Sequence, residues 1–510
     1  DLIVTGVQTC ALPICFFCAE AQEELLALVR HEGLGAVVLA GESAQAFEHM
    51  LSGPRFIDDL DSAGVPTTRI AFANLAEQVA WAHAGEPAQA AVKARLLIDT
   101  ALAKSAKCHV GEEVLLTPRQ AVLVIGGGRR ALAAAKQLMD VGVRVMVVAS
   151  GPEPTEWPDP GWQAVLADLR RSPMVDLWYG TRLTDVKGWC GGYEARLTGL
   201  HGADDLRVGG FVVCTDDADV LHELQPLLQL DLDDAGLPRS PWMGSMVGKT
   251  HSPGVWFVPP TDDSEPRQVA CATSAPVLAL MGALFKPELR HTILMSEVNA
   301  EVCGGCGTCV KTCAFHAAAI DAQARLSHTD VLRCKGCGNC VTSCPTGARD
   351  LIAYPSRYVL DAIDTLASER PSPDDPLVLA AMCAGCGTPA ANAAGRDGLP
   401  MAYSANIMPL TIECGGAVDT QYVLHAFAVG FDGVALCVCR DDHCHHVVGN
   451  LDMERRLSLF RDVLRSRGIN PERLRTMKVA CDDGDRFRTE MAEFTEDLRA
   501  YGLQNARRSQ

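Results

Sequence analysis

The sequence predicts a multidomain α/β protein, and three observations carry this prediction. A strand, a glycine loop, a helix and a second strand follow one another between residues 121 and 149, which predicts a Rossmann-like domain. Two runs of four closely spaced cysteines lie between residues 303 and 344, which predicts a small α+β insert. A third group of cysteines is interleaved with strands and helices after residue 376, and it predicts a carboxyl-terminal α/β domain.

Length, charge and cysteine content restrict the class of protein. The 510 residues are enough for about three to four domains. The formal net charge of -18 argues against nucleic-acid binding, and no apolar run reaches the ~18 residues of a membrane span. Many of the 22 cysteines occur in C-x-x-C steps, which predicts metal ligation in a reducing compartment. We therefore expect a cytoplasmic protein without a membrane span.

The chain divides into six segments by pattern. Residues 1–14 resemble a translated sequencing-adaptor string and are interpreted as an artefact, so the natural chain is expected to extend further upstream. The remaining segments are predicted to be an amino-terminal α/β domain fragment (15–118), an abbreviated Rossmann-like dinucleotide-binding domain (119–290), the cysteine-rich insert (291–353), a helix and linker (354–375) and the carboxyl-terminal cysteine-rich domain (376–505).

Apolar spacing predicts individual helices and strands within these segments. Residues 150–290 are expected to be mostly irregular because they are rich in Pro, Asp and Gly. The predicted strands are Ala36–Ala40, Ala121–Ile125, Val143–Ala149, Gly210–Cys214, Leu377–Ala381 and Gly433–Cys437. The predicted helices are Gln22–Arg30, Ala88–Ala103, Ala131–Val141, Thr420–Phe427 and Asp452–Arg467.

The glycine loop of the Rossmann-like domain has the spacing Gly126-x-Gly128-x-x-Ala131. A loop of this kind, between a strand and a helix amino terminus, is typical of a site for the pyrophosphate of a dinucleotide such as FAD. The acidic residue that should hold the ribose is missing, since the second strand ends at Ala149 and Ser150. A Rossmann-like domain that binds nothing is therefore the alternative.

The two cysteine runs of the insert have the spacing of bacterial two-cluster ferredoxins. Each run supplies three thiolates to one [4Fe–4S] cluster and a fourth to the other. We expect one cluster to be held by Cys303, Cys306, Cys309 and Cys344, and the second by Cys334, Cys337, Cys340 and Cys313. The alternative is a pair of structural zinc sites, which normally use two separated pairs of ligands.

The carboxyl-terminal domain offers five candidate ligands for one further metal site. These are Cys383, Cys386, Cys414, Cys439 and Cys444, and Cys437 and Cys481 lie near them in the sequence. Four thiolates are enough for a [2Fe–2S] cluster. Zinc is the alternative, because His443, His445 and His446 could also serve as ligands.

This last domain resembles the delta subunit of methyl-viologen-reducing hydrogenase. The resemblance is carried by the cysteine pair Cys383–Cys386 and by Met408–Asp419, Val423–Gly433, Cys439–Asn450 and Gly468–Arg473. It implies a [2Fe–2S] cluster that exchanges electrons with a hydrogenase or a formate dehydrogenase.

The rest of the chain resembles the A subunit of heterodisulfide reductase. Phe17–Gln22, Gly33–Leu39, Asn74–His83 and the glycine loop within Val122–Leu138 carry this resemblance. It implies a flavin, and partners similar to the B and C subunits of heterodisulfide reductase. A fusion of the A subunit and the hydrogenase delta subunit in one chain is a known arrangement in this family.

We therefore expect an oxidoreductase subunit that relays electrons through iron–sulfur clusters, with no residue acting as acid, base or nucleophile. The alternatives are a self-contained flavin oxidoreductase that uses NAD(P)H and a scaffold with structural zinc. Cys190, Cys214 and Cys271 are expected to be buried thiols. No metal site is predicted at Cys15 and Cys18.

Overall fold

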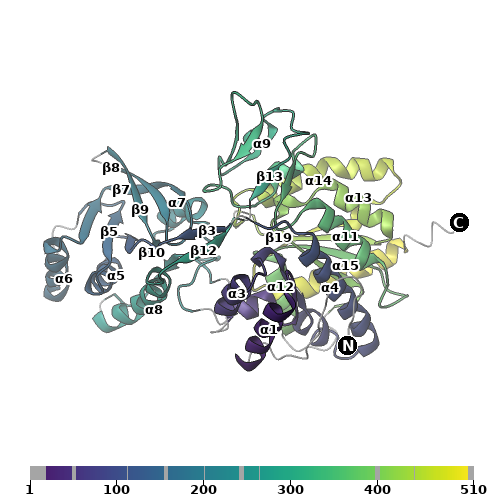
Figure 1. Cartoon of the computed structure of the whole chain (residues 1–510), viewed down its shortest axis with the longest axis horizontal. Coiled ribbons are helices and arrows are strands. Elements are labelled where there is room, and N and C mark those ends of the chain that lie inside the picture. The colour runs from purple at the N-terminus through teal and green to yellow at the C-terminus, as the bar shows by residue number, and fades with distance from the viewer. Residues whose placement is uncertain are drawn as a thin grey trace.

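The computed structural model describes residues 19–48, 53–111, 113–153, 159–199, 202–240, 246–263, 265–293, 295–396, 403–441 and 443–503. The adaptor-like segment, Cys15 and Cys18 lie outside these residues. Four regions are arranged around a common centre (Figure 1). The Rossmann-like domain lies on the left of this view, the cysteine-rich insert at the top, the carboxyl-terminal domain on the right and the amino-terminal region at the bottom.

The amino-terminal region contains a small parallel sheet of two strands, with Val37 opposite Ile70. Its first helices cover this sheet and form a separate apolar core around Phe47, Phe56 and Leu60. The elements are α1 (Ala19–Glu32), β1 (Val37–Gly41), α2 (Ala44–Glu48), α3 (Gly53–Ser62), β2 (Ile70–Asn74) and α4 (Pro87–Lys107). The last helix, α4, packs both on this sheet, through Ala101, and on the carboxyl-terminal domain, to whose core it contributes Leu96 and Leu97.

The Rossmann-like domain has a five-stranded parallel sheet in the order β11-β10-β4-β5-β6 and an antiparallel sheet of β7, β8 and β9. The chain enters the domain through β3 and leaves it through β12, and these two strands pair antiparallel. The elements are β3 (Glu113–Leu116), β4 (Ala121–Ile125), α5 (Arg129–Asp140), β5 (Arg144–Ala149), α6 (Pro160–Arg171), β6 (Val175–Tyr179), β7 (Thr181–Lys187), β8 (Tyr193–Gly199), β9 (Gly202–Val208), β10 (Gly210–Val213), α7 (Ala218–Leu228), β11 (Val255–Phe257), α8 (Pro266–Leu284) and β12 (Leu289–Thr292).

The expectation that residues 150–290 are mostly irregular is wrong. Three helices and the strands β6 to β9 and β11 lie in this segment beside the predicted strand β10. The strand β8 alternates buried and more exposed residues, as a half-buried strand does, whereas β9 (Gly202–Val208) is mostly exposed and polar and gives no apolar pattern. Helix α8 has the length and apolar composition of a membrane span. Its residues Val269, Val277 and Leu280 are buried in the core of this domain.

The cysteine-rich insert is a small α+β unit with two antiparallel strand pairs, β13 with β16 and β14 with β15. Two short helices each begin directly after a glycine in the left-handed conformation, Gly307 (φ +76°) and Gly338 (φ +81°). The elements are β13 (Ser296–Val298), α9 (Thr308–Thr312), β14 (Ala318–Ile320), β15 (Ser327–Thr329), α10 (Asn339–Thr342) and β16 (Arg349–Leu351).

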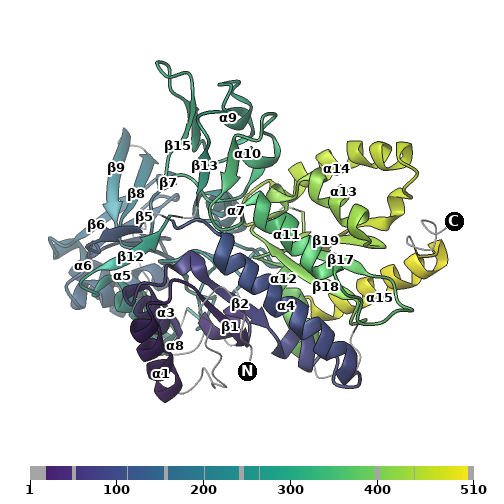
Figure 2. The same cartoon turned by 45° about the vertical axis from the view of Figure 1, so that its right-hand side comes forward.

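The carboxyl-terminal domain is a four-stranded parallel sheet in the order β18-β17-β19-β20, with helices on its faces (Figure 2). Its central strands β17 and β19 are buried along their whole length, as expected of a parallel sheet between helix layers. The elements are α11 (Ser356–Ala367), β17 (Val378–Cys383), α12 (Gly387–Arg396), β18 (Ile407–Ile412), α13 (Thr420–Val429), β19 (Gly433–Cys439), α14 (Gly449–Ser466), β20 (Leu474–Val479) and α15 (Gly484–Tyr501).

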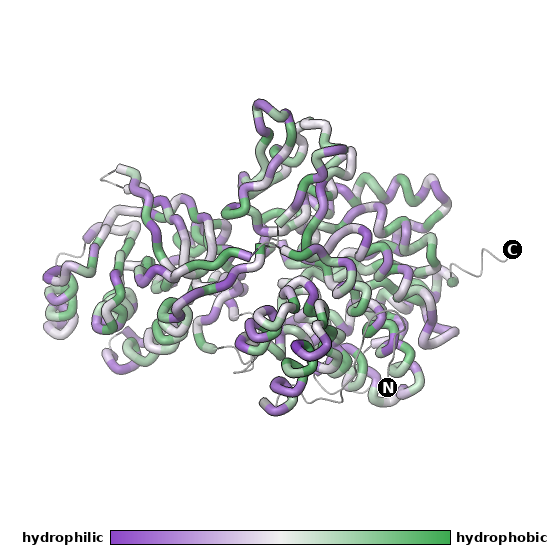
Figure 3. Tube along the Cα trace, viewed as in Figure 1, coloured by the Kyte–Doolittle hydropathy of each residue, from purple (hydrophilic) through white to green (hydrophobic). Residues whose placement is uncertain are grey.

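The outer helices of this domain are amphipathic. In Figure 3 the tube alternates between hydrophobic and hydrophilic residues along α14. The buried residues of α14 include Met453, Leu457 and Phe460, whereas Leu459 is exposed. This spacing of three to four residues is the period of a helix with one apolar face.

Candidate functional site

The cysteines of the insert gather around two small cavities. One cavity is lined by Cys303, Cys306, Cys309 and Cys344. The other is lined by Cys313, Cys334, Cys337 and Cys340. Each group therefore contains three cysteines of one run and one of the other, which is the grouping that the spacing predicts for two cubane clusters.

Hydrogen-bond donors point at the sulfur atoms of this insert. The amide of Ala317 donates to Cys313 Sγ at 3.2 Å, and the amide of Ser327 donates to Cys303 Sγ at 3.5 Å. The buried side chain of Arg349 lines both cavities, and its Nη1 lies 3.9 Å from Cys340 Sγ. Such donors stabilise negative charge on thiolates and on a bound cluster.

The two cavities differ in their access to solvent. Cys306 is exposed, and hydrogen bonds from Thr308 hold the pKa of its thiol below the usual range. Cys337 lies at the inner cavity, where burial raises the pKa of its thiol. The Cys303 group is therefore the outer site of the insert, and the Cys334 group is the inner site.

The candidate ligands of the carboxyl-terminal domain meet at the carboxyl edge of its parallel sheet. Cys383 and Cys439 are the last residues of the neighbouring strands β17 and β19, and Cys414 follows β18. Their loops bring in Cys386 and Cys444. The Sγ atoms of Cys383 and Cys439 are 3.7 Å apart, and those of Cys414 and Cys444 are 3.9 Å apart.

These five thiols are buried and share their protons. Hydrogen bonds from Cys386 and Cys439 hold the pKa of Cys383 well below its usual range, and the same sharing raises the pKa of Cys386 and Cys439. In the Cys414–Cys444 pair, the hydrogen bond between the two thiols raises the pKa of Cys414 and lowers the pKa of Cys444. Thiols this close together and this deeply buried can all become thiolates only beside a compensating cation, which a metal centre supplies.

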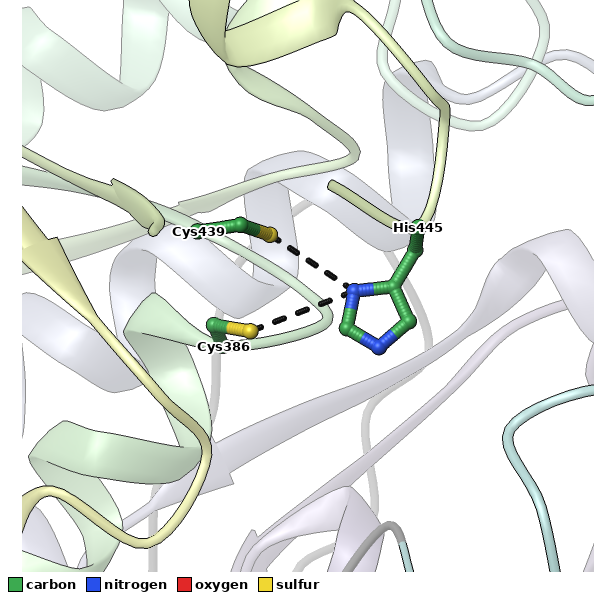
Figure 4. Close-up of side chains that lie close together, drawn as sticks. All are labelled: Cys386, Cys439 and His445. Atoms are coloured by element: carbon green, nitrogen blue, oxygen red, sulfur yellow. Dashed lines mark hydrogen bonds between the residues drawn. The ribbon is translucent and has the colours of Figure 1, made fainter. Parts of the chain in front are cut away.

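Only glycine fits beside the thiols of Cys414 and Cys444 at position 449. A Cβ on Gly449, the first residue of α14, would overlap Cys414 Sγ and would lie 3.6 Å from Cys444 Sγ. A nitrogen donor is also present, because His445 Nδ1 lies 3.6 Å from Cys439 Sγ and 3.9 Å from Cys386 Sγ (Figure 4). The residues present therefore fit a [2Fe–2S] cluster and also fit a zinc ion.

Two nearby cysteines lie outside this group. Cys437 is fully buried within β19, and its Sγ lies 4.0 Å from the sulfur of Met477. Cys481 follows β20, and its Sγ lies 3.9 Å from the carbonyl oxygen of Ser240. Burial raises the pKa of both thiols.

The insert packs directly on the carboxyl-terminal site. The Thr342 hydroxyl donates to the carbonyl oxygen of Gly416 at 3.0 Å. A Cβ on Gly416 would lie 2.8 Å from the carbonyl oxygen of Cys337, so the two backbones touch. His446 Nε2 also lies 3.1 Å from the carbonyl oxygen of Lys335. The inner site of the insert and the Cys414 side of the carboxyl-terminal site are thus neighbours.

The glycine loop of the Rossmann-like domain fits a dinucleotide only in part. Gly126 has φ +136°, and Gly128 precedes α5 with open space on its Cβ side. Ala131, in the first turn of α5, is buried. Arg130 in the first turn of α5 is held by Asp216, 2.9 Å away. The end of β5 carries no carboxylate, and the next acid along the chain, Glu153, pairs with Arg170.

The comparisons with known proteins agree with the two resemblances in the sequence. Residues 378–502 match the family of the methyl-viologen-reducing hydrogenase delta subunit, and residues 302–348 match the 4Fe–4S dicluster domain. The D iron–sulfur subunit of F420-non-reducing hydrogenase from Archaeoglobus profundus is 30% identical over 128 residues, which are 25% of this chain and 92% of that protein. Through residues 378–502, the chain belongs to this hydrogenase subunit family.

The delta-subunit-like domain, as residues 378–502 are called from here on, is joined to sequence of a second family. The A subunit of Ferredoxin:CoB-CoM heterodisulfide reductase from Methanosarcina mazei is 31% identical over 234 residues, which are 46% of this chain and 28% of that protein. The chain thus spans little more than a quarter of that relative. The resemblance to both families is confirmed. Among solved structures, a thioredoxin reductase of Streptococcus pyogenes matches 33% of this chain and 53% of its own at 15% identity, with a TM-score of only 0.17.

Three residues near these sites have positions that the sequence does not predict. Arg349 has no motif of its own, and Asp231 approaches the delta-subunit-like domain from the Rossmann-like domain. His445 is expected from the sequence only as an alternative zinc ligand. The prediction of buried thiols is confirmed for Cys190 and Cys214 but wrong for Cys271, which is exposed on α8.

Proposed function

We propose that this chain is the iron–sulfur electron-transfer subunit of a heterodisulfide-reductase-type oxidoreductase. It would relay single electrons between a hydrogenase or formate dehydrogenase module and proteins similar to the B and C subunits of heterodisulfide reductase. The named relatives support this role, since one belongs to a heterodisulfide reductase and the other is an iron–sulfur subunit of a hydrogenase.

In this proposal the two cysteine groups of the insert each hold a [4Fe–4S] cluster, and four of the five cysteines of the delta-subunit-like domain hold a [2Fe–2S] cluster. When bound, these clusters supply one-electron transfer at potentials set by their surroundings. The protein contributes burial, hydrogen bonds to sulfur and the positive charge of Arg349.

The direct packing of the insert on the delta-subunit-like domain is the observation that carries the proposal. Gly416, two residues after Cys414, touches the loop that contains Cys337 and Asn339. Electron transfer requires neighbouring centres with no wide water-filled gap between them. The contact supports the order outer, inner and carboxyl-terminal for the three proposed sites, and the exposed Cys306 supports an outer end that is open to a partner.

The proposal is tested by anaerobic purification followed by measurement of iron, acid-labile sulfide and EPR spectra after reduction. We expect about ten irons and about ten sulfides per chain, eight of each from two cubanes and two from the [2Fe–2S] cluster. Magnetic coupling between the reduced centres should broaden their EPR signals, because the sites are neighbours.

A matched pair of variants locates the third cluster. Cys439→Ser should lose about two irons, the [2Fe–2S] signal and part of the broadening. Cys437→Ser changes a residue two positions earlier on the same strand. This variant should keep the irons, the [2Fe–2S] signal and the broadening, because the thiol of Cys437 packs on Met477. Zinc without iron would overturn the electron-transfer role. Bound flavin with NADH-dependent cluster reduction would favour the alternative of a self-contained flavin oxidoreductase, for which the loop at Gly126–Gly128 is the structural basis.

A further inference from the structure

Two further side chains of types that can bind metals lie behind His445, on the side of the imidazole that faces away from the cysteines. Asp231 and His251 of the Rossmann-like domain reach this position from the loops that follow α7. Asp231 Oδ2 lies 3.7 Å from His445 Nε2 and 3.8 Å from His251 Nε2. All three donor atoms lie within 4.8 Å of one another.

These donor atoms are buried and lack hydrogen bonds. Asp231 is 3% exposed and His445 7% exposed. Asp231 Oδ2, His251 Nε2 and His445 Nε2 have no hydrogen-bond partner among the described residues. The carboxylate oxygen Asp231 Oδ2 lies 3.7 and 3.8 Å from the two imidazole nitrogens, which is too far for a hydrogen bond to either of them. Leaving such groups unsatisfied is costly, so something is expected to lie between them.

We propose that Asp231, His251 and His445 bind one divalent first-row transition-metal ion, zinc or ferrous iron, at the junction of the Rossmann-like and delta-subunit-like domains. Two imidazoles and one carboxylate form a donor set that both ions accept. Ligands ~2.0–2.1 Å from a tetrahedral ion lie about 3.4 Å from one another. The distances from Asp231 Oδ2 to the two imidazole nitrogens are a few tenths of an ångström longer than this. Small rotations of the side chains would bring the three atoms to ligand distance.

The residues around the three proposed ligands orient the ligands and leave their donor atoms free for an ion. His445 Nδ1 faces Cys439 and Cys386, so hydrogen bonding to sulfur orients the ring and leaves Nε2 for the ion. His443 Nδ1 lies 3.9 Å from the other carboxylate oxygen of Asp231. Arg239 Nε lies 3.9 Å from Asp231 Oδ2, an ion-pair distance that is too long for a hydrogen bond, and the guanidinium also pairs with Asp482.

A large cavity borders this position at His251. It has a volume of about 790 Å³ and lies where the amino-terminal region, the Rossmann-like domain and the delta-subunit-like domain meet. His251 forms part of its wall, together with residues such as Asn74, Lys104 and Thr411. An open coordination position on this side would be filled by water or by a small ligand from the cavity, as in three-ligand catalytic metal sites.

The test uses the complete chain, purified anaerobically with its clusters and then incubated with one equivalent of Zn²⁺ or of Fe²⁺. Zinc, iron and acid-labile sulfide are measured together after removal of unbound metal. Iron in iron–sulfur clusters of these types equals sulfide, so a mononuclear ion appears as one zinc, or as one iron in excess of sulfide. This count separates the new site from the three clusters, and hence from a failure of the proposed function.

We expect one such ion in the unaltered chain, and a loss of at least five-fold in its occupancy in Asp231→Asn and in His251→Gln. The control Asp234→Asn changes an exposed carboxylate three residues away and should retain the ion. The cluster EPR signals should be the same in all variants. X-ray absorption at the zinc edge should show only nitrogen and oxygen ligands, and Mössbauer spectra should show one high-spin ferrous site for iron. An unaltered chain without an excess ion, or zinc with sulfur ligands, would overturn the proposal.

Discussion

The close approach of Gly449 to two cysteines predicts that Gly449→Ala removes the third cluster and leaves the other two. The new Cβ would fall more than about 1 Å inside the ordinary contact distance of about 3.4 Å to Cys414 Sγ. Metal–ligand distances tolerate changes of only about 0.2 Å. Cys414 must therefore turn away, whereas the helical backbone at position 449 accepts alanine. Overpacking of this kind also costs about 1–3 kcal/mol of stability.

The measurement is the iron and sulfide content of the anaerobically purified variant. We expect about eight irons instead of about ten, loss of the [2Fe–2S] EPR signal, and unchanged cubane signals. Gly282→Ala is the control, because it adds the same methyl group to a helix with no atom within 4 Å. If Gly449→Ala keeps about ten irons and the [2Fe–2S] signal, then Cys414 is not a ligand.

Three further perturbations have defined outcomes. Arg349→Gln removes a buried positive charge that lines both cavities, so the midpoint potentials of the cubanes in an EPR redox titration should fall by about 60 mV or more, the equivalent of ~1.4 kcal/mol for one electron. Gly338→Ala places a Cβ 2.5 Å from that of Ala417 and should reduce the magnetic coupling between the inner and carboxyl-terminal centres, whereas Gly307→Ala, with a similar positive φ and open space, should strain the backbone but leave this coupling intact. Burial lowers the pKa of Lys93 to about 7, against about 10.4 in the unfolded chain. The unfolded chain therefore binds more protons between these values, stability should rise with pH across this window, and Lys93→Met should flatten the increase in Tm between about pH 7 and 9.

The sequence predicts those features that depend on local spacing. The strand Ala121–Ile125 is predicted with the bounds it has in the structure, because a run of buried aliphatic residues between turns has few other conformations. The grouping of the insert cysteines follows from their spacing, since a C-x-x-C step and its glycines bring three sulfurs together before any tertiary contact forms.

Features that depend on contacts between distant segments could not be predicted in this way. Asp231 and His445 are separated by more than two hundred residues, and neither stands in a pattern that indicates the other. The strand β9 is mostly exposed and polar, so its place in the sheet depends on pairing with β8. The sequence places seven cysteines near the third site, five of them as candidate ligands, and the contacts of the other two, Cys437 and Cys481, are seen only in the structure.

The paired strands β3 and β12 give the Rossmann-like domain a narrow neck, since its first and last strands lie side by side with Leu116 opposite Leu289. A domain attached in this way can be gained, lost or exchanged as one cassette, because removing it leaves two chain ends that a short turn can rejoin. Such an excision would keep every candidate cysteine ligand of the three cluster sites but would delete Asp231 and His251. The neck thus separates the part of the chain that carries the candidate cluster ligands from the domain that carries Asp231 and His251.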